Sequence, residues 1–142
     1  MNTISPFFIA ASAAIILFLG LAHFLFTFYG PRLLPRDREL ITRMQETSLV
    51  LTNETSLWNA WIGFNASHGL GAILFGAVYG YLSLAHGAFL FQSAYLLSLG
   101  LIVLLIYLFL ARRYWFSVPF RGILLSTVLY IAALFTNCYR GW

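Results

Sequence analysis

Charged side chains are scarce in this chain of 142 residues, because aspartate, glutamate, lysine and arginine together make only 8% of it. A water-soluble domain carries about 25% charged residues, so the composition excludes an ordinary soluble domain. Lysine is absent, and arginine supplies all eight positive side chains. The single cysteine, Cys138, excludes an intrachain disulfide and a cysteine-based metal site. No basic face in water is visible, so we expect no nucleic-acid partner.

The chain is instead rich in long apolar runs. Crossing about 30 Å of hydrocarbon takes about 20 apolar residues in a helix. Four runs meet that length, over residues 6–29, 57–85, 88–111 and 118–137. We therefore predict an all-α fold, a four-transmembrane-helix bundle, that forms a single domain over residues 1–142. The lipid bilayer is then an expected partner.

Residues 30–56 are the only substantial aqueous segment. Within it, Leu40, Ile41 and Met44 lie near helical spacing with charged residues between and around them. This pattern predicts a short amphipathic helix at the cytoplasmic interface, between the first and second transmembrane helices. Asn53 or Ser56 is expected to cap the start of the second transmembrane helix.

The arginines indicate the orientation in the membrane. With four spans, the first and third loops share one face, and seven arginines lie in or beside them: Arg32, Arg36, Arg38, Arg43, Arg112, Arg113 and Arg121. The opposite face has only Arg140. The positive-inside rule then predicts a cytoplasmic arginine face and places both termini on the other side.

Small residues form a stripe on the second apolar run. Asn65, Gly69, Ala72, Gly76 and Gly80 recur every three or four residues, so they lie on one helix face. Lipid gives helices no hydrophobic reason to associate, and small residues allow backbones to approach closely. We interpret the stripe as packing within the chain, with a dimer motif as the alternative.

Several polar side chains are expected at similar depth. His23 lies six residues before Tyr29, roughly 9 Å inside the cytoplasmic boundary, and His68 lies seven residues beyond Trp61, roughly 10 Å inside it. An unpaired polar group in hydrocarbon costs several kcal/mol, so these groups must meet each other or a ligand. The candidate pocket residues are His23, Asn65, Ser67, His68, Tyr107 and Ser126.

These residues are compatible with a structural hydrogen-bond cluster or with a binding site. Intramembrane ionisable residues are candidates for function by default, and this supports the binding site. The site would be a pocket that opens towards the cytoplasmic leaflet. Its ligand is then a lipid, a quinone or a thiol conjugate, with the head group near Arg112, Arg113 and Arg121. Arginine binds carboxylate or phosphate through two hydrogen bonds. The alternative explanation for these three arginines is that they set the orientation in the membrane and contact lipid phosphate.

Cofactor binding gives two further alternatives. His23 and His68 together have the chemistry of bis-histidine haem ligation. A non-haem metal site would need carboxylates or a third histidine at the same depth, and His86 is expected in the opposite turn. We therefore predict no non-haem metal, and keep haem as an alternative.

The segments "TSLWNAWIGFNASHGLGAILFGAVYGYL" and "RYWFSVPFRG", with the motif "WxxWxGFNxSH", resemble a family of small four-span bacterial membrane proteins described only as hypothetical. The resemblance runs over most of the chain, from "GLAHFLFTFYGP" onward. It implies a bacterial membrane protein and no activity. With the orientation predicted from the arginines, we expect the bacterial inner membrane as the location, with both termini periplasmic.

A weaker resemblance is to the membrane-associated eicosanoid and glutathione metabolism proteins, which are four-helix subunits that form trimers. "IYLFLARRYWFSVPFRG" is similar to the stretch where that family leaves its third helix and enters its fourth. The resemblance implies that Arg113, Tyr114 and Arg121 face glutathione. "FNASH" is similar to an Asn-plus-acid stretch of that family, with His68 in place of the acid and without the arginine of that helix.

Our leading functional expectation is therefore a membrane protein that binds a hydrophobic or amphiphilic ligand, or a small accessory subunit of a membrane complex. A glutathione-transferase-like membrane enzyme and a bis-histidine haem carrier are the alternatives. Homo-oligomers and larger membrane complexes are both compatible with the sequence, and enzymatic activity is left open.

Overall fold

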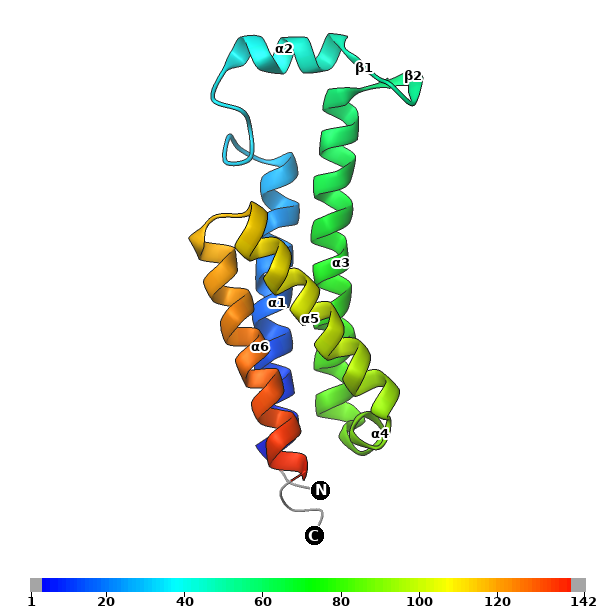
Figure 1. Cartoon of the computed structure of the whole chain (residues 1–142), viewed down its shortest axis with the longest axis vertical. Coiled ribbons are helices and arrows are strands. Elements are labelled where there is room, and N and C mark those ends of the chain that lie inside the picture. Colours follow the sequence, from blue (N-terminus) through cyan, green and yellow to red (C-terminus); the bar gives the residue numbers. More distant parts are fainter. Residues whose placement is uncertain (1–3, 139–142) are drawn as a thin grey trace. The chain divides into compact units, whose positions relative to one another are not determined.

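The computed structural model describes residues 4–138, and Figure 1 shows its helices and strands in chain order. Arg140 and the two chain ends, which entered the prediction of orientation, lie outside these residues. The described elements are α1 (Ile4–Phe28), α2 (Arg38–Glu46), β1 (Ser48–Leu49), β2 (Thr52–Ser56), α3 (Leu57–Ala85), α4 (Gly87–Gln92), α5 (Ala94–Tyr114) and α6 (Ser117–Cys138).

Four of these helices are long and apolar enough to cross a membrane, namely α1, α3, α5 and α6 as far as Asn137. The prediction of a mainly helical fold with four candidate membrane spans is therefore confirmed. The bundle arrangement, the cytoplasmic position of residues 30–56 and the periplasmic termini stay predictions.

Local sequence explains where the helices begin and end. Gly30 follows α1 with φ of 85°, a left-handed conformation that glycine adopts without a steric penalty and that commonly ends helices. Asp37 caps α2, because its side chain accepts a hydrogen bond of 2.9 Å from the backbone N–H of Glu39. The predicted cap at Ser56 is confirmed, since its Oγ accepts from the N–H of Asn59 at 3.3 Å.

The prediction of one continuous third span over residues 88–111 is wrong at its start. The apolar run contains two helices, α4 and α5, separated at Ser93. The Ser93 side chain accepts a hydrogen bond of 3.2 Å from the N–H of Leu96, so Ser93 begins a new helix in place of continuing the old one. The candidate span is therefore Ala94–Tyr114.

The all-α prediction also missed a small antiparallel sheet between α2 and α3. Strands β1 and β2 pair with Ser48 opposite Ser56 and Leu49 opposite Thr52, and the register shifts between these two pairs. The N–H of Leu57 donates to the carbonyl of Thr47 at 2.8 Å, which joins the end of α2 to the start of α3. The hairpin thus occupies the end of the aqueous segment, residues 30–56, in which only a helix was predicted.

The contacts divide the chain into two compact units. The first unit joins the chain up to Leu19 with the chain from Ala72 onward, and the second unit is Gly20–Gly71. Helices α1 and α3 each contribute one part to the first unit and the other part to the second. The prediction of a single domain therefore stays a prediction.

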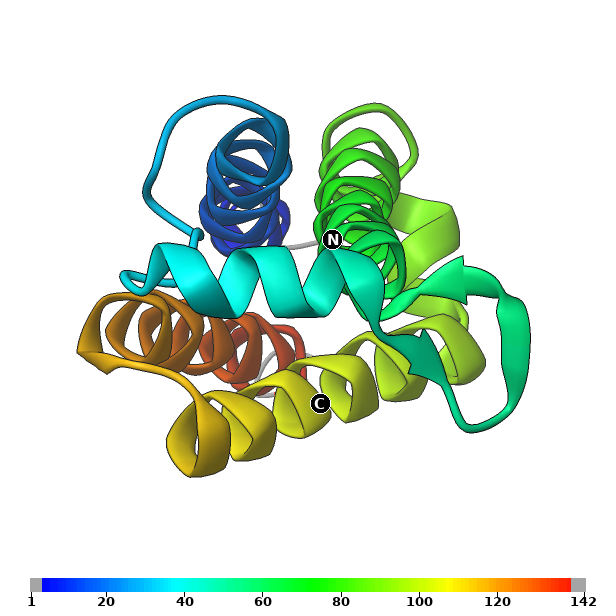
Figure 2. The same ribbon diagram turned by 90° about the horizontal axis from the view of Figure 1, so that it is seen from above.

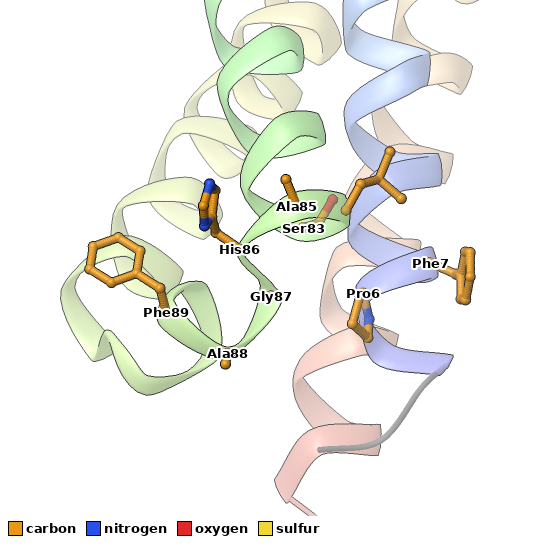
Figure 3. A pocket seen from close by; sticks show the side chains of 9 residues that line it. Pro6, Phe7, Ser83, Ala85, His86, Gly87, Ala88 and Phe89 are labelled. Atoms are coloured by element: carbon orange, nitrogen blue, oxygen red, sulfur yellow. The ribbon is translucent and has the colours of Figure 1, made fainter.

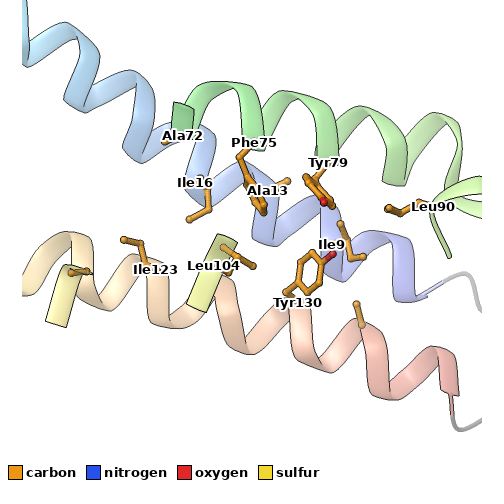
Figure 4. Packing of buried hydrophobic residues seen from close by; sticks show 12 residues of the cluster. Ile9, Ala13, Ile16, Ala72, Phe75, Tyr79, Leu90, Leu104, Ile123 and Tyr130 are labelled. Atoms are coloured by element: carbon orange, nitrogen blue, oxygen red, sulfur yellow. The ribbon is translucent and has the colours of Figure 1, made fainter. Parts of the chain in front are cut away.

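The first unit contains the buried apolar core, which Figure 4 shows. Its members come from α1, α3, α4, α5 and α6, and α5 packs along α6. They are Ile9, Ala13, Ile16, Ala72, Phe75, Tyr79, Leu90, Leu104, Ala111, Ile123, Tyr130 and Ala133. Alanines at contact positions allow the helices to approach closely, as in other membrane helix interfaces.

The small-residue stripe of α3 packs against α1 in both units. In the second unit, a Cβ at Gly69 would lie only 3.0 Å from the backbone nitrogen of Phe24. In the first unit, a Cβ at Gly76 would lie 2.7 Å from the carbonyl oxygen of Ala13 and from the backbone nitrogen of Leu17. The prediction that the stripe packs within the chain is therefore confirmed at both glycines.

Two tyrosines of the first unit hold the first turns of α5. The Tyr79 hydroxyl donates to the carbonyl of Leu96 at 2.7 Å, and the Tyr130 hydroxyl donates to the carbonyl of Leu97 at 3.1 Å. The Tyr79 ring and the Tyr130 hydroxyl lie against Gly100, where a Cβ would be 2.7 Å from the Tyr79 ring. The glycine therefore leaves room for two hydroxyl groups, each of which has a hydrogen-bond partner inside the apolar core.

Candidate functional site

The second unit brings together three of the predicted site residues from two candidate membrane spans. His23 of α1 lies beside Asn65 of α3, with 3.1 Å between Nε2 of the imidazole and Oδ1 of the amide. The amide nitrogen of Asn65 donates to the carbonyl of Trp61 at 2.8 Å. This second bond orients the amide oxygen towards His23, so Nε2 of His23 is the donor of the pair.

His68 completes the cluster by ring contact. Its imidazole meets that of His23 edge to face, with ring centroids 5.1 Å apart and an angle of 82° between the planes. Both imidazoles are half-buried. The contact is possible because the neighbouring residues Phe24 and Gly69 bring the backbones of α1 and α3 together at this level. We call His23, Asn65 and His68 the histidine site.

Two hydroxyl groups of the same unit take no part in the histidine site. Ser67 was predicted as a pocket residue, but its side chain is exposed and its Oγ donates to the carbonyl of Phe64 at 3.1 Å. Thr27 is buried and donates to the carbonyl of His23 at 2.8 Å, a bond along its own helix. Neither hydroxyl therefore adds a polar atom to the imidazole pair.

The first unit contains the predicted pocket residues Tyr107 and Ser126. The Tyr107 ring lies 6.4 Å from that of Trp115, measured between centroids. Ser126 Oγ lies 2.8 Å from Oγ of Ser12 and donates to the carbonyl of Ser12 at 3.0 Å. Because Ser126 uses its hydrogen on that carbonyl, the Ser12 hydroxyl donates to Ser126. The two serines thus form a buried, self-satisfied link between α1 and α6.

We expect Ser126→Ala to cost about 0.6 kcal/mol of stability, the average value of such a link between membrane helices. The change removes both hydrogen bonds of Ser126 and leaves the apolar packing of its Cβ. The midpoint of thermal unfolding in detergent, followed by circular dichroism, measures the loss. Ser98→Ala on the exposed face of α5 is the matched control, and an equal effect of the two substitutions would contradict the link.

The three predicted anion-binding arginines also belong to the first unit, and all are exposed. The guanidinium carbon of Arg112 lies 5.6 Å from the centroid of the Phe120 ring, and that of Arg113 lies 5.9 Å from the centroid of the Tyr114 ring. Arg121 occupies the first turns of α6. Cation–π contacts of this kind are worth about 0.5–1 kcal/mol at exposed sites, and they leave the guanidinium hydrogens available for anions.

The histidine site does not fit haem in its described geometry. Two axial imidazoles bind iron from opposite faces of the porphyrin, so the ring plane must pass between them. Here the two imidazoles touch edge to face, and Nε2 of His23 is engaged with Asn65. Within residues 4–138, no three side chains of histidine, cysteine, aspartate or glutamate form a group that could hold a metal ion.

A pocket of about 520 Å³ lies in the first unit, where α3 ends and α4 begins (Figure 3). Pro6 and Phe7 of α1 line one side, and the remaining lining is residues 83–89. Its polar groups are already engaged, because Ser83 donates to the carbonyl of Gly80 and His86 Nε2 lies 3.1 Å from the Tyr81 hydroxyl. No sequence motif marks this pocket, since its lining is mostly apolar.

No protein-family model, no curated protein sequence and no solved structure matches this chain. The interpretation of the histidine site therefore depends on its own geometry and chemistry.

Proposed function

We propose that this protein binds an amphiphilic ligand in the membrane, with the polar head of the ligand at the histidine site near the cytoplasmic leaflet. The observation that carries the proposal is the contact of two half-buried imidazoles and one amide, drawn from two candidate membrane spans. Such groups are costly in hydrocarbon and are retained mostly where they meet a ligand, a proton or a partner.

The chemistry of the site favours an uncharged head with hydroxyl or carbonyl groups. With Nε2 of His23 donating to Asn65, the other ring nitrogen of a neutral His23 is an acceptor. A ligand hydroxyl can donate to that nitrogen, as the hydroxyl of a quinol or of a neutral lipid would. A charged head would lose more hydration in the bilayer than these neutral partners return.

The proposal is tested with two probes, a short-chain quinol kept in its reduced form and a diacylglycerol that carries a photoactivatable diazirine. Quinol binding is followed by quenching of tryptophan fluorescence, since Trp61 lies one turn from Asn65 and stacks on Trp58. We expect saturable binding of at least one probe, weakened about tenfold by His23→Leu with His68→Leu, because loss of one hydrogen bond of about 1.4 kcal/mol is a factor of ten.

His86→Leu is the matched control, because His86 is the third histidine and lies in the first unit, paired with Tyr81. Its variant should bind both probes as the unchanged protein does. The proposal fails if neither probe binds saturably, or if the double histidine variant, folded by circular dichroism, binds as well as the control.

The role of a small accessory subunit gives a different set of results. The histidine site would then be structural, neither probe would bind saturably, and other subunits would co-purify with the chain from its native membrane. Mass spectrometry of the purified material distinguishes the two roles in one experiment.

The two enzyme and cofactor alternatives are separated by direct assays. A glutathione-transferase-like enzyme would conjugate glutathione to an electrophile and lose that activity in Arg113→Ala. A haem carrier would show a Soret band that His23→Ala and His68→Ala remove, and haem uptake would first have to separate the touching rings.

A further inference from the structure

The tip of the hairpin carries two adjacent apolar side chains, Val50 and Leu51, that are almost fully exposed. Leu51 is 92% exposed, whereas outside the tip the exposure of large apolar side chains in residues 4–138 does not exceed 75%. Single exposed apolar residues are normal, but two adjacent ones at the tip of a hairpin form a small exposed apolar patch.

Turn chemistry does not account for these two residues. Two-residue hairpin turns favour asparagine, aspartate or glycine, because the preferred turn types need positive φ. Val50 and Leu51 stand between the paired residues Leu49 and Thr52, and φ is positive at no residue except glycine within the described chain. Valine and leucine at these positions therefore satisfy a requirement other than backbone geometry.

The hairpin lies where a candidate membrane span begins. Strand β2 ends at Ser56, and α3 starts with the next residue. Trp58 and Trp61 stack in the first turns of α3, with centroids 5.4 Å apart, and tryptophan is enriched at the boundary between hydrocarbon and head groups. The hairpin is therefore tethered at the level of the bilayer interface.

Helix α2 supports the same placement within the second unit. It packs on β2 and runs across the direction of α3, so that Figure 2 shows α2 lengthwise and the start of α3 end-on. Its Ile41 and Met44 are half-buried and Leu40 is exposed, with charged residues around them. An amphipathic helix that crosses the direction of a span has the orientation of a helix lying in the membrane plane.

The charges of the second unit balance. Its four arginines are matched by four acidic residues, and Glu39 pairs with Arg43. Anionic lipid attracts segments with excess positive charge, and this segment has none. Attraction of the hairpin to a bilayer would therefore come from apolar contact and would not need anionic lipid.

We propose that the hairpin tip, Val50 and Leu51, is a lipid-contacting element that inserts into the bilayer interface beside the start of α3. The partner is a lipid surface of any charge. Insertion of the tip and contact of α2 with the same surface would anchor the start of α3 at a defined depth. This inference does not depend on ligand binding at the histidine site.

The test uses an environment-sensitive fluorophore attached to single cysteines. In a Cys138→Ser background, the full chain carries Leu51→Cys, or Asn53→Cys as the matched exposed position on β2, and is labelled with nitrobenzoxadiazole. The proteins are placed in nanodiscs of zwitterionic lipid with or without a lipid that bears a nitroxide near its head group. We expect emission at shorter wavelength and several-fold stronger quenching at position 51 than at position 53.

Three results would overturn the inference. Emission typical of water at both positions would place the tip in solvent. A shift to shorter wavelength without nitroxide quenching would mean that protein, such as a second copy of the chain, covers the tip. A signal that arises only after anionic lipid is added would mean that charge, not apolar contact, brings the hairpin to the membrane.

Discussion

Gly76→Ile should prevent stable packing of α3 on α1. A Cβ at this position would lie 2.6 Å from Cβ of Leu17 and 2.7 Å from two backbone atoms of α1, which cannot rotate away as a flexible side chain does. Overpacking of a tight core costs about 1–3 kcal/mol, and a branched side chain against backbone exceeds that range. We expect Gly76→Ile to lose the monodisperse peak in size-exclusion chromatography, and Gly76→Ala to lower the unfolding midpoint clearly.

Gly63→Ile makes the same change on the same helix and is the control. A Cβ at Gly63 has no atom within 4 Å, apart from those of its own helix and chain neighbours, and Gly63 is exposed. This variant should therefore behave like the unchanged protein. If Gly76→Ile and Gly63→Ile were equally stable, the close approach of α1 and α3 at Gly76 would be wrong.

Tyr130→Ala should be the most damaging substitution on α6. Tyr130 is completely buried, packs edge to face on Tyr79 and donates to the carbonyl of Leu97. Removing a large buried aromatic side chain costs about 3–5 kcal/mol, through lost burial and the cavity that remains. Tyr130→Phe keeps the ring and should cost only about 1 kcal/mol, the net value of one hydrogen bond. Both losses are measured from unfolding in denaturant or from thermal midpoints in detergent.

Tyr114→Ala is the reference for a tyrosine that does not pack in the core. Tyr114 is 71% exposed at the end of α5, so we expect little change in the unfolding midpoint of this variant. Equal destabilisation by Tyr130→Ala and Tyr130→Phe would contradict the packing role of the Tyr130 ring, because it would assign the whole effect to the hydroxyl group.

The candidate spans could be predicted from the sequence because each is an unbroken apolar run. Residues 57–85 match α3 at both ends. The break at Ser93 could not be predicted, since a serine in an apolar run is compatible with a continuing helix and only its hydrogen bond to Leu96 marks a new start. The hairpin was missed because Val50 and Leu51 do not have the composition of a turn.

The histidine site could be predicted in part, for a geometrical reason. Helix rise gives the depth of a residue, and depth placed His23 near Asn65 and His68. Depth does not give the direction of a side chain. Ser67 lies two residues from Asn65 and therefore points roughly 200° around the helix from it. The pairing of Ser126 with Ser12 was likewise beyond prediction, because it depends on which helix packs against α6.

The unequal lengths of α3 and α5 have a consequence for the surrounding lipid. The 29 residues of α3 extend about 44 Å and the 21 residues of α5 about 32 Å, against a hydrocarbon core of about 30 Å. Helix α5 matches an average bilayer, whereas α3 must tilt or project beyond it. In a thicker bilayer α3 could stand upright, whereas α5 would be shorter than the hydrocarbon core. The tilt of α3 should therefore decrease as the acyl chains of the lipid lengthen.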